Sequence, residues 1–225
     1  MGLGMIDFHV HYNKDYPLID KACIFPFTHE IYEGDNPDFK DTKEWQEKRQ
    51  KENEKNLGIE NTTAFLFLWT DFNISNIEMY GGIKVHRHWN EPVYDWGSKK
   101  GQLALESIRD LNLPVIIDDL PDRIIRFIRE FAIGIDVVIP HLTMYPTIKK
   151  SRVLTLSNVY VDTSVTWVSY MMDYIKSFGA DRIIFGTDWP YGNVQNQVRR
   201  IQILPISNRK KQKILNENAL KLVTL

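Results

Sequence analysis

Short apolar runs recur along the whole chain, and most of them precede a segment with helical spacing. Several runs, such as residues 137–140 and 182–185, do not alternate with polar residues. Continuous apolar runs of this kind are typical of parallel strands that are covered on both faces. The runs expected to form strands are 5–10, 21–27, 62–69, 82–85, 114–117, 137–140, 159–161 and 182–185.

The segments between the runs place apolar residues on one helical face. One apolar stripe extends to Phe131, and Pro121 before it suits the first turn of a helix. Another stripe ends at Gly179, which suits the end of a helix. Ser207 is a plausible N-cap for the last helix, whereas the connection 71–80 is too short for a long one. The expected helices cover residues 41–56, 104–111, 121–131, 167–178 and 207–222.

Alternation of strand and helix, repeated eight times, predicts the fold class. We expect a single α/β domain over residues 1–225, folded as a (β/α)₈ barrel of the TIM type and somewhat reduced in length. A doubly wound open sheet is the competing architecture. No Gly-x-Gly-x-x-Gly sequence follows the first run, so the usual reason to prefer a dinucleotide-binding sheet is missing.

Composition narrows the possible partners. The chain is 43% hydrophobic and 25% charged with a net charge of −1, which gives no basic field for nucleic acid or an anionic membrane. No apolar stretch approaches the roughly 18 residues of a membrane helix. The first residues lack a signal-peptide pattern, so a cytoplasmic location is expected. Cys23 lies in an apolar run and is expected to be a buried, inert thiol.

The most informative motif is Asp7-Phe8-His9-Val10-His11, near the start of the chain. In a regular strand Asp7, His9 and His11 share one face, and the two imidazoles lie about 6.6 Å apart at roughly 3.3 Å per residue. Two neutral imidazoles at this separation can bind one divalent ion. Taken alone, a pair of histidines that only form hydrogen bonds in a barrel mouth is the better explanation.

Polar residues also end other runs, and in a barrel these ends meet at one mouth, where active sites lie. Any single case is explained by a cap or a satisfied core group, and we interpret Asp162 and Ser164 as helix N-cap residues. Four of the six histidines nevertheless fall at expected strand ends, which favours a site. The residues at these ends are His9, His11, Lys84, His86, Asp118, His141, Asp162 and Asp188.

These motifs resemble the amidohydrolase superfamily, and within it the amidohydrolase-2 branch that includes aminocarboxymuconate-semialdehyde decarboxylase and related lactonases. The specific anchors are the first-strand motif at 6–11 and Gly186-Thr187-Asp188 at the end of the last strand. The resemblance implies that His9 and His11 bind metal. It also implies that Asp188 binds or faces the metal and accepts a proton from the attacking water. His141 would bind a second metal, as in two-metal members, or polarise the substrate and shuttle protons, as in one-metal members.

The fifth strand departs from the family pattern, because Asp118 stands where a metal-binding histidine is usual. Aspartate also binds zinc, manganese or iron. We therefore expect one divalent ion, zinc or, given the oxygen ligands, manganese or iron. Its expected ligands are His9, His11, Asp118 and Asp188. The same substitution also fits a weakened or lost metal site. Lys84 and His86 are expected to face the substrate. Two-metal members carry a carboxylated lysine on the fourth strand, but for Lys84 a structural lysine paired with a barrel carboxylate is the better explanation.

The resemblance implies a metal-dependent hydrolase that attacks an amide, lactone or similar carbonyl centre of a small molecule through metal-activated water. The alternatives are a decarboxylase or metal-independent lactonase of the same family, with Arg87 or Arg123 binding a substrate carboxylate, and a non-catalytic barrel with a degenerate metal site. Nucleic acid and membrane are not expected as partners, and association into a homo-oligomer is left open. Substrate selection is expected in loops 12–17, 28–40 and 86–100.

Overall fold

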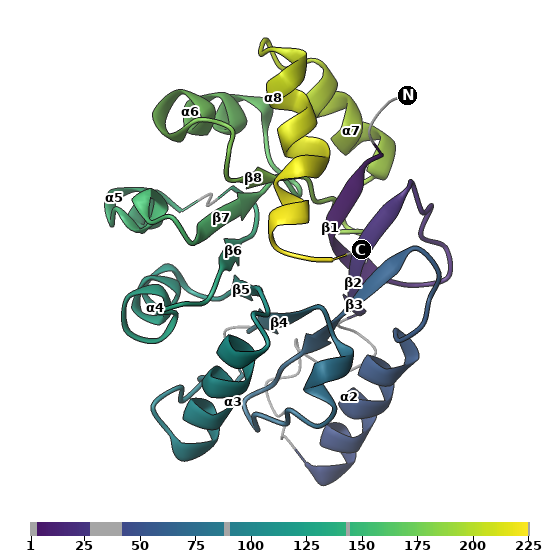
Figure 1. Cartoon of the computed structure of the whole chain (residues 1–225), viewed down its shortest axis with the longest axis vertical. Helices are drawn as coiled ribbons and strands as arrows, with labels where there is room; N and C mark the ends of the chain where they lie inside the picture. Colours follow the sequence, from purple (N-terminus) through teal and green to yellow (C-terminus); the bar gives the residue numbers. More distant parts are fainter. Residues whose placement is uncertain (1–3, 28–41, 88–90, 143–144, 225) are drawn as a thin grey trace.

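The computed structural model shows eight parallel strands that pair in chain order around a nearly closed barrel, with helices outside it (Figure 1). This confirms the expected α/β barrel. The structure describes residues 4–27, 42–87, 91–142 and 145–224, and the expected loop at 28–40 lies outside them. The strands are β1 Ile6–Tyr12, β2 Lys21–Pro26, β3 Thr62–Phe67, β4 Gly82–His86, β5 Val115–Asp118, β6 Val137–Ile139, β7 Val159–Asp162 and β8 Ile183–Ile184.

Each strand lies in or overlaps one of the eight expected runs. The barrel closes where the chain after β8 meets β1, through a parallel bridge between Val10 and Trp189. The backbone N–H of Asp188 donates to the carbonyl of His9 over 2.7 Å, and Phe8 donates to Phe185 over 2.9 Å. The first and last strands, which carry the two specific motifs, are therefore neighbours.

Each of the five expected helical segments overlaps a helix, whereas the helices at Pro146–Lys150 and Val194–Gln202 fall outside them. Ser207 is the N-cap of α8, and its side chain accepts from the N–H of Lys210. A single 3₁₀ turn at Ile77–Met79 occupies the short connection between β3 and β4. The helices are α2 Lys43–Lys55, α3 Lys99–Asp110, α4 Pro121–Arg126, α5 Pro146–Lys150, α6 Val168–Phe178, α7 Val194–Gln202 and α8 Asn208–Gln212, with π turns at Phe127–Phe131 and Lys213–Glu217 and 3₁₀ turns at Val153–Thr155 and Ala219–Lys221.

Two apolar layers hold the barrel together. Val115 and Ile117 of β5 pack outward with residues of the helices, whereas Ile116 packs in the lumen, so the strand is buried on both faces as its composition predicts. The lumen cluster also contains Leu222 and Val223. The C-terminal segment, yellow in Figure 1, runs across one end of the barrel and closes it.

Strand β1 departs from regular alternation. Its register with β2 shifts by one residue between Asp7 and Val10, which is a β-bulge. Phe8 packs in the lumen, but Val10 packs outside it with Tyr16. The expectation that Asp7 shares a face with His9 is therefore wrong, because the extra residue reverses the alternation between them.

Asp7 instead joins β1 to the segment after β8. It is fully buried and accepts hydrogen bonds from the hydroxyls of Thr187 (2.6 Å) and Tyr16 (2.9 Å) and from the N–H of Thr187 (2.9 Å). Burial raises the pKa of Asp7 to about 6, although these donors oppose the rise. At pH 7 the carboxylate is thus ionised, and it is compensated by hydrogen bonds.

We expect Asp7→Ala to lower the free energy of unfolding by about 3 kcal/mol, because several buried donors lose their charged acceptor. Urea unfolding at pH 7 measures the change. Asp15→Ala is the matched control, since Asp15 is exposed and surface substitutions usually change stability by only about 0.5 kcal/mol. Equal unfolding midpoints for the two variants would show that the hydrogen bonds of Asp7 between β1 and the segment after β8 add nothing to stability.

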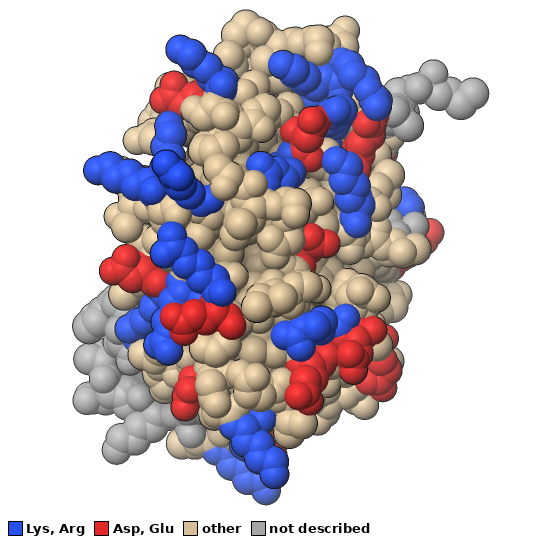
Figure 2. Space-filling view, turned by 60° about the vertical axis from the view of Figure 1, so that its left-hand side comes forward, with Lys and Arg blue, Asp and Glu red and all other residues tan. Residues whose placement is uncertain are grey.

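One face of the molecule is mixed in charge. Figure 2 shows Lys and Arg interspersed with Asp and Glu over one face, without a large field of one sign. Among the described residues, no helix combines the length and the apolar character needed to cross a membrane. Cys23 is buried as expected, and burial raises the pKa of its thiol well above the ordinary value.

Candidate metal centre and active site

His9, His11 and Asp188 converge at the barrel mouth. Nε2 of His9 lies 3.3 Å from Oδ1 of Asp188, and Nε2 of His11 lies 3.4 Å from the same oxygen. One ligand atom from each residue lies within 4.8 Å of the others, and all three residues are buried. The β-bulge in β1 makes this possible, because it turns His9 and His11 inward while Phe8 still fills the lumen below.

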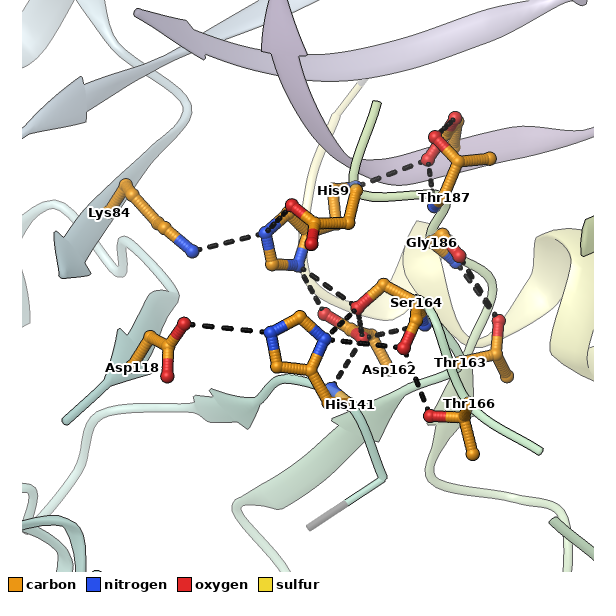
Figure 3. Close-up of polar contacts among 12 residues, drawn as sticks. His9, Lys84, Asp118, His141, Asp162, Thr163, Ser164, Thr166, Gly186 and Thr187 are labelled. Carbon is orange, nitrogen blue, oxygen red and sulfur yellow. Dashed lines mark hydrogen bonds and ion pairs between the residues drawn. The ribbon is translucent and has the colours of Figure 1, made fainter. Parts of the chain in front are cut away.

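The remaining ring nitrogens have acceptors that orient the imidazoles. Nδ1 of His9 lies 2.7 Å from Oδ2 of Asp162 (Figure 3), and Nδ1 of His11 lies 3.3 Å from the carbonyl oxygen of Pro26. Both contacts favour a proton on Nδ1 and leave the lone pair on Nε2, an arrangement typical of metal-binding histidines. Burial lowers the pKa of His11 to about 4, so this ring is neutral at pH 7.

The electrostatics of this group fit a cation. Burial raises the pKa of Asp188, but His9 and His11 outweigh it and hold the pKa well below its ordinary value. Burial and Lys84 lower the pKa of His9, but Asp162 and Asp188 outweigh them and raise it. An ionised oxygen and two ring nitrogens thus meet in a buried place, where a positive charge between them is favourable. Two imidazole nitrogens and one carboxylate oxygen suit zinc, manganese or iron.

Backbone conformation brings Asp188 close to His9 and His11. Asp188 adopts a left-handed conformation with φ of +58°, which is tolerated by aspartate but uncommon outside glycine and is found at functional sites. Gly186 lies two residues after the end of β8, and a Cβ there would lie 2.9 Å from Cβ of His9. The glycine is thus required by the close approach of the two chains.

A second polar group lies beside the first. Oδ2 of Asp118 is 3.5 Å from Nε2 of His86 and 3.6 Å from Nε2 of His141. The other nitrogen of His141, Nδ1, lies 3.2 Å from the carbonyl of Ser164 and 2.9 Å from its hydroxyl. His141, like Asp188, has a left-handed backbone, with φ of +58°.

This second group holds a charged imidazole. Burial lowers the pKa of His141, but the adjacent Asp118 carboxylate, together with Asp162 and Asp188, raises it to about 9. Conversely, burial raises the pKa of Asp118, and His141, His86 and Lys84 hold it far below the ordinary range. His141 is therefore an imidazolium at neutral pH and has a proton to donate.

The structure thus sorts the expected site residues into two adjoining groups. His9, His11 and Asp188 form one, and His86, Asp118 and His141 form the other. Lys84 joins the first group, with Nζ 3.1 Å from Nε2 of His9. Within the described ranges Asp118 is not among the convergent ligand atoms, and its expected role as a metal ligand stays a prediction.

Asp162 and Ser164 have a role that their place in the sequence did not reveal. Their interpretation as N-cap residues is wrong, because α6 begins only at Val168 and its N-cap, Trp167, makes no side-chain cap bond. Oδ1 of Asp162 accepts from the backbone N–H of His141 (3.0 Å) and from the hydroxyl of Ser164, while Oδ2 faces His9. The alternation of side chains along β7 was the signal for this role, because it places Asp162 on the same strand face as Tyr160, which packs in the lumen.

The two arginines expected at the mouth contact Asp119 instead. Its Oδ1 lies 3.3 Å from Arg123 and 3.8 Å from Arg87, and Arg87 also donates to the carbonyl of Glu91 over 2.6 Å. Asp119 follows Asp118 directly and lines a different pocket, together with Ile117 of the outer layer. The contacts therefore pair both arginines with Asp119, and their expected role in binding a substrate carboxylate stays a prediction.

Family comparison agrees with the motifs at the strand ends. The sequence model of the Amidohydrolase family, Amidohydro_2, matches residues 80–225. The chain belongs to this family. Membership confirms the resemblance drawn from the sequence and places this amidohydrolase among enzymes. A comparison with curated protein sequences finds no match.

Solved structures with this fold include both decarboxylases and a hydrolase. A dihydroxybenzoic acid decarboxylase from a Polaromonas species, with bound manganese and the inhibitor 2-nitroresorcinol, superposes with a TM-score of 0.72 at 16% identity over 99% of this chain and 97% of that one. A 5-carboxyvanillate decarboxylase from Novosphingobium aromaticivorans, complexed with manganese, gives 0.70 at 14% identity over 91% and 76%.

The hydrolase is a probable 2-pyrone-4,6-dicarboxylic acid hydrolase from Acinetobacter baumannii with citric acid bound. It superposes with a TM-score of 0.64 at 14% identity over 98% of this chain and 99% of that one. At these identities the likeness establishes the shared barrel. The choice between hydrolysis and decarboxylation therefore depends on the site of this amidohydrolase itself.

Proposed function

We propose that this amidohydrolase is a metal-dependent hydrolase that acts on an amide, lactone or similar carbonyl centre of a small molecule. The observation that supports it is the convergence of His9, His11 and Asp188, whose ligand atoms lie within 4.8 Å of one another in a buried mouth. A single domain over residues 1–225 and a cytoplasmic location are part of this proposal as predictions of the sequence.

His9, His11 and Asp188 would hold one divalent ion, zinc, manganese or iron. When bound, such an ion lowers the pKa of a water molecule and polarises a carbonyl oxygen. Asp162 orients His9 for this role through Nδ1, at 2.7 Å, and the Pro26 carbonyl does the same for His11. The two manganese-containing decarboxylases of the same fold support the presence of an ion at this mouth.

The other residues supply acid and base chemistry. Asp188 is ionised and can accept the proton of the attacking water. His141 is protonated at neutral pH, so it can stabilise a developing oxyanion or protonate the leaving group. Asp118 and Ser164 orient its two nitrogens. Lys84 and His86 lie beside these groups, where we expect contact with the substrate.

Decarboxylation is the second candidate, and one observation favours it. The protonated His141 and the buried Lys84 ammonium place two positive groups around the proposed ligands, which suits a substrate carboxylate. Once a substrate that the enzyme converts is identified, release of CO₂ without incorporation of ¹⁸O from labelled water into the product would identify decarboxylation. Uptake of one ¹⁸O into the product without CO₂ would identify hydrolysis.

A thermal melt tests the metal site without a known substrate. An ion that binds only the native state stabilises it by RT ln(1 + [L]/Kd), about 2.7 kcal/mol at 100 times Kd. We expect Mn²⁺ or Zn²⁺ to raise the melting temperature of EDTA-treated protein, and His9→Ala to remove the response. A flat response of the wild type to both ions would contradict the proposal and favour a metal-independent lactonase or a degenerate site.

A further inference from the structure

Lys84 lies in the lumen beside the proposed metal ligands. Its side chain is fully buried, and lysine is almost never fully buried unless a partner compensates it. Nζ lies 3.1 Å from Nε2 of His9 (Figure 3) and 4.9 Å from the centroid of the Phe25 ring. Hydrolysis as proposed above does not by itself explain why this strand places an ammonium there.

The contact uses the nitrogen that a metal ion needs. When the His9 ring is neutral and its Nδ1 proton is directed to Asp162 at 2.7 Å, Nε2 offers one lone pair. That lone pair accepts from the Lys84 ammonium or binds an ion, but it does not do both. An ion held by Nε2 would be a second cation beside the ammonium, and two cations around one nitrogen repel strongly in a buried site. Metal binding therefore requires the ammonium to move.

The surrounding charges attract the ammonium as they would attract a metal ion. Burial lowers the pKa of Lys84, and the carboxylates of Asp118, Asp188 and Asp162 oppose that fall and favour the ammonium. Lys84 thus supplies one positive charge next to the place where the lone pairs of His9, His11 and Asp188 meet. When no ion is bound, this charge lies against the ligand nitrogen of His9.

We propose, resting on the metal site of the proposed function, that the Lys84 ammonium serves as the cation of this site in the metal-free protein. A divalent ion must displace it from His9, so Lys84 sets the affinity of the site for metal. Lys84 is a positioning residue in this role, and it keeps the three ligands together until an ion arrives.

Titration with Mn²⁺ at pH 7, followed by the EPR signal of the free ion, tests the competition. Lys84→Met and Lys84→Gln remove the charge at similar length, Lys84→Arg keeps it, and Lys100→Met is a control because Lys100 is exposed. We expect the two neutral variants to bind Mn²⁺ at least about tenfold more tightly than the wild type. Lys84→Arg and Lys100→Met should bind no more tightly than the wild type.

Thermal melts give a second readout that a purely structural role would not produce. In EDTA the neutral variants should melt below the wild type, because the carboxylates of Asp118, Asp162 and Asp188 lose a nearby positive charge, and saturating Mn²⁺ should reduce or reverse this difference. If the wild type binds Mn²⁺ and both neutral variants bind it equally or more weakly, the competition is refuted and the metal site stands. If no variant binds Mn²⁺, both the competition and the metal site are refuted.

Discussion

Substitution of His9 by alanine is expected to remove the bound metal and nearly all activity. His9 contributes Nε2 to the convergent group, and without it only His11 and Asp188 face the ion. Enzymes accelerate their reactions by roughly 10⁶-fold or more, and an ion that activates water is expected to supply much of this. Elemental analysis of protein purified without chelator, together with turnover of an identified substrate, measures both losses.

His86→Ala is the matched control for this experiment. His86 is also an imidazole at a strand end, but its Nε2 faces Asp118 at 3.5 Å rather than the group around Asp188. We expect this variant to keep its metal and to change substrate affinity. Near-zero metal in both the wild type and His9→Ala would falsify the proposed mechanism, and loss of metal from His86→Ala would show that the ion lies nearer β4.

Substitution of His141 by glutamine is expected to give the second largest effect. A positioned general acid contributes typically 10²- to 10⁴-fold, so kcat should fall by about that factor while the metal content stays at the wild-type level. The loss should be smallest for substrates with good leaving groups, which need little protonation. A variant that retains kcat would exclude His141 as the acid.

The pH profile gives an independent check on His141. Asp118, Asp162 and Asp188 face this imidazole and raise its pKa to about 9, against the opposing effect of burial. The acid form is therefore present below pH 9 and is lost as the pH rises through that value, so the wild-type rate should fall on the alkaline side near pH 9. Asp118→Asn should move this limb toward the ordinary value of 6.5.

The same Asp118→Asn variant separates the two roles of the aspartate. If Asp118 mainly holds the charge of His141, as the 3.6 Å contact suggests, the variant keeps its metal and shifts only the alkaline limb. If Asp118 is the fourth metal ligand that the sequence predicts, the variant loses metal as His9→Ala does. Elemental analysis and the rate profile on one protein sample distinguish these outcomes.

The local pattern of apolar and polar residues was enough to predict the barrel and the ends of its strands. Runs such as 137–140 are buried on both faces, and a strand with two buried faces must be apolar throughout, so each strand is visible in its own few residues. The polar residues that stop these runs mark the mouth, and His9, His11 and Asp188 were found in this way.

Contacts between segments that are distant in the sequence could not be predicted from that local pattern. The bridge from His9 to Asp162 joins residues 153 positions apart, and neither residue alone indicates the other. The β-bulge that turns His9 inward depends on how β1 pairs with β2, and so does the outward place of Asp7. Hydrophobic periodicity encodes which face of a strand is buried, whereas register, closure and the pairing of charges are decided only when the strands meet.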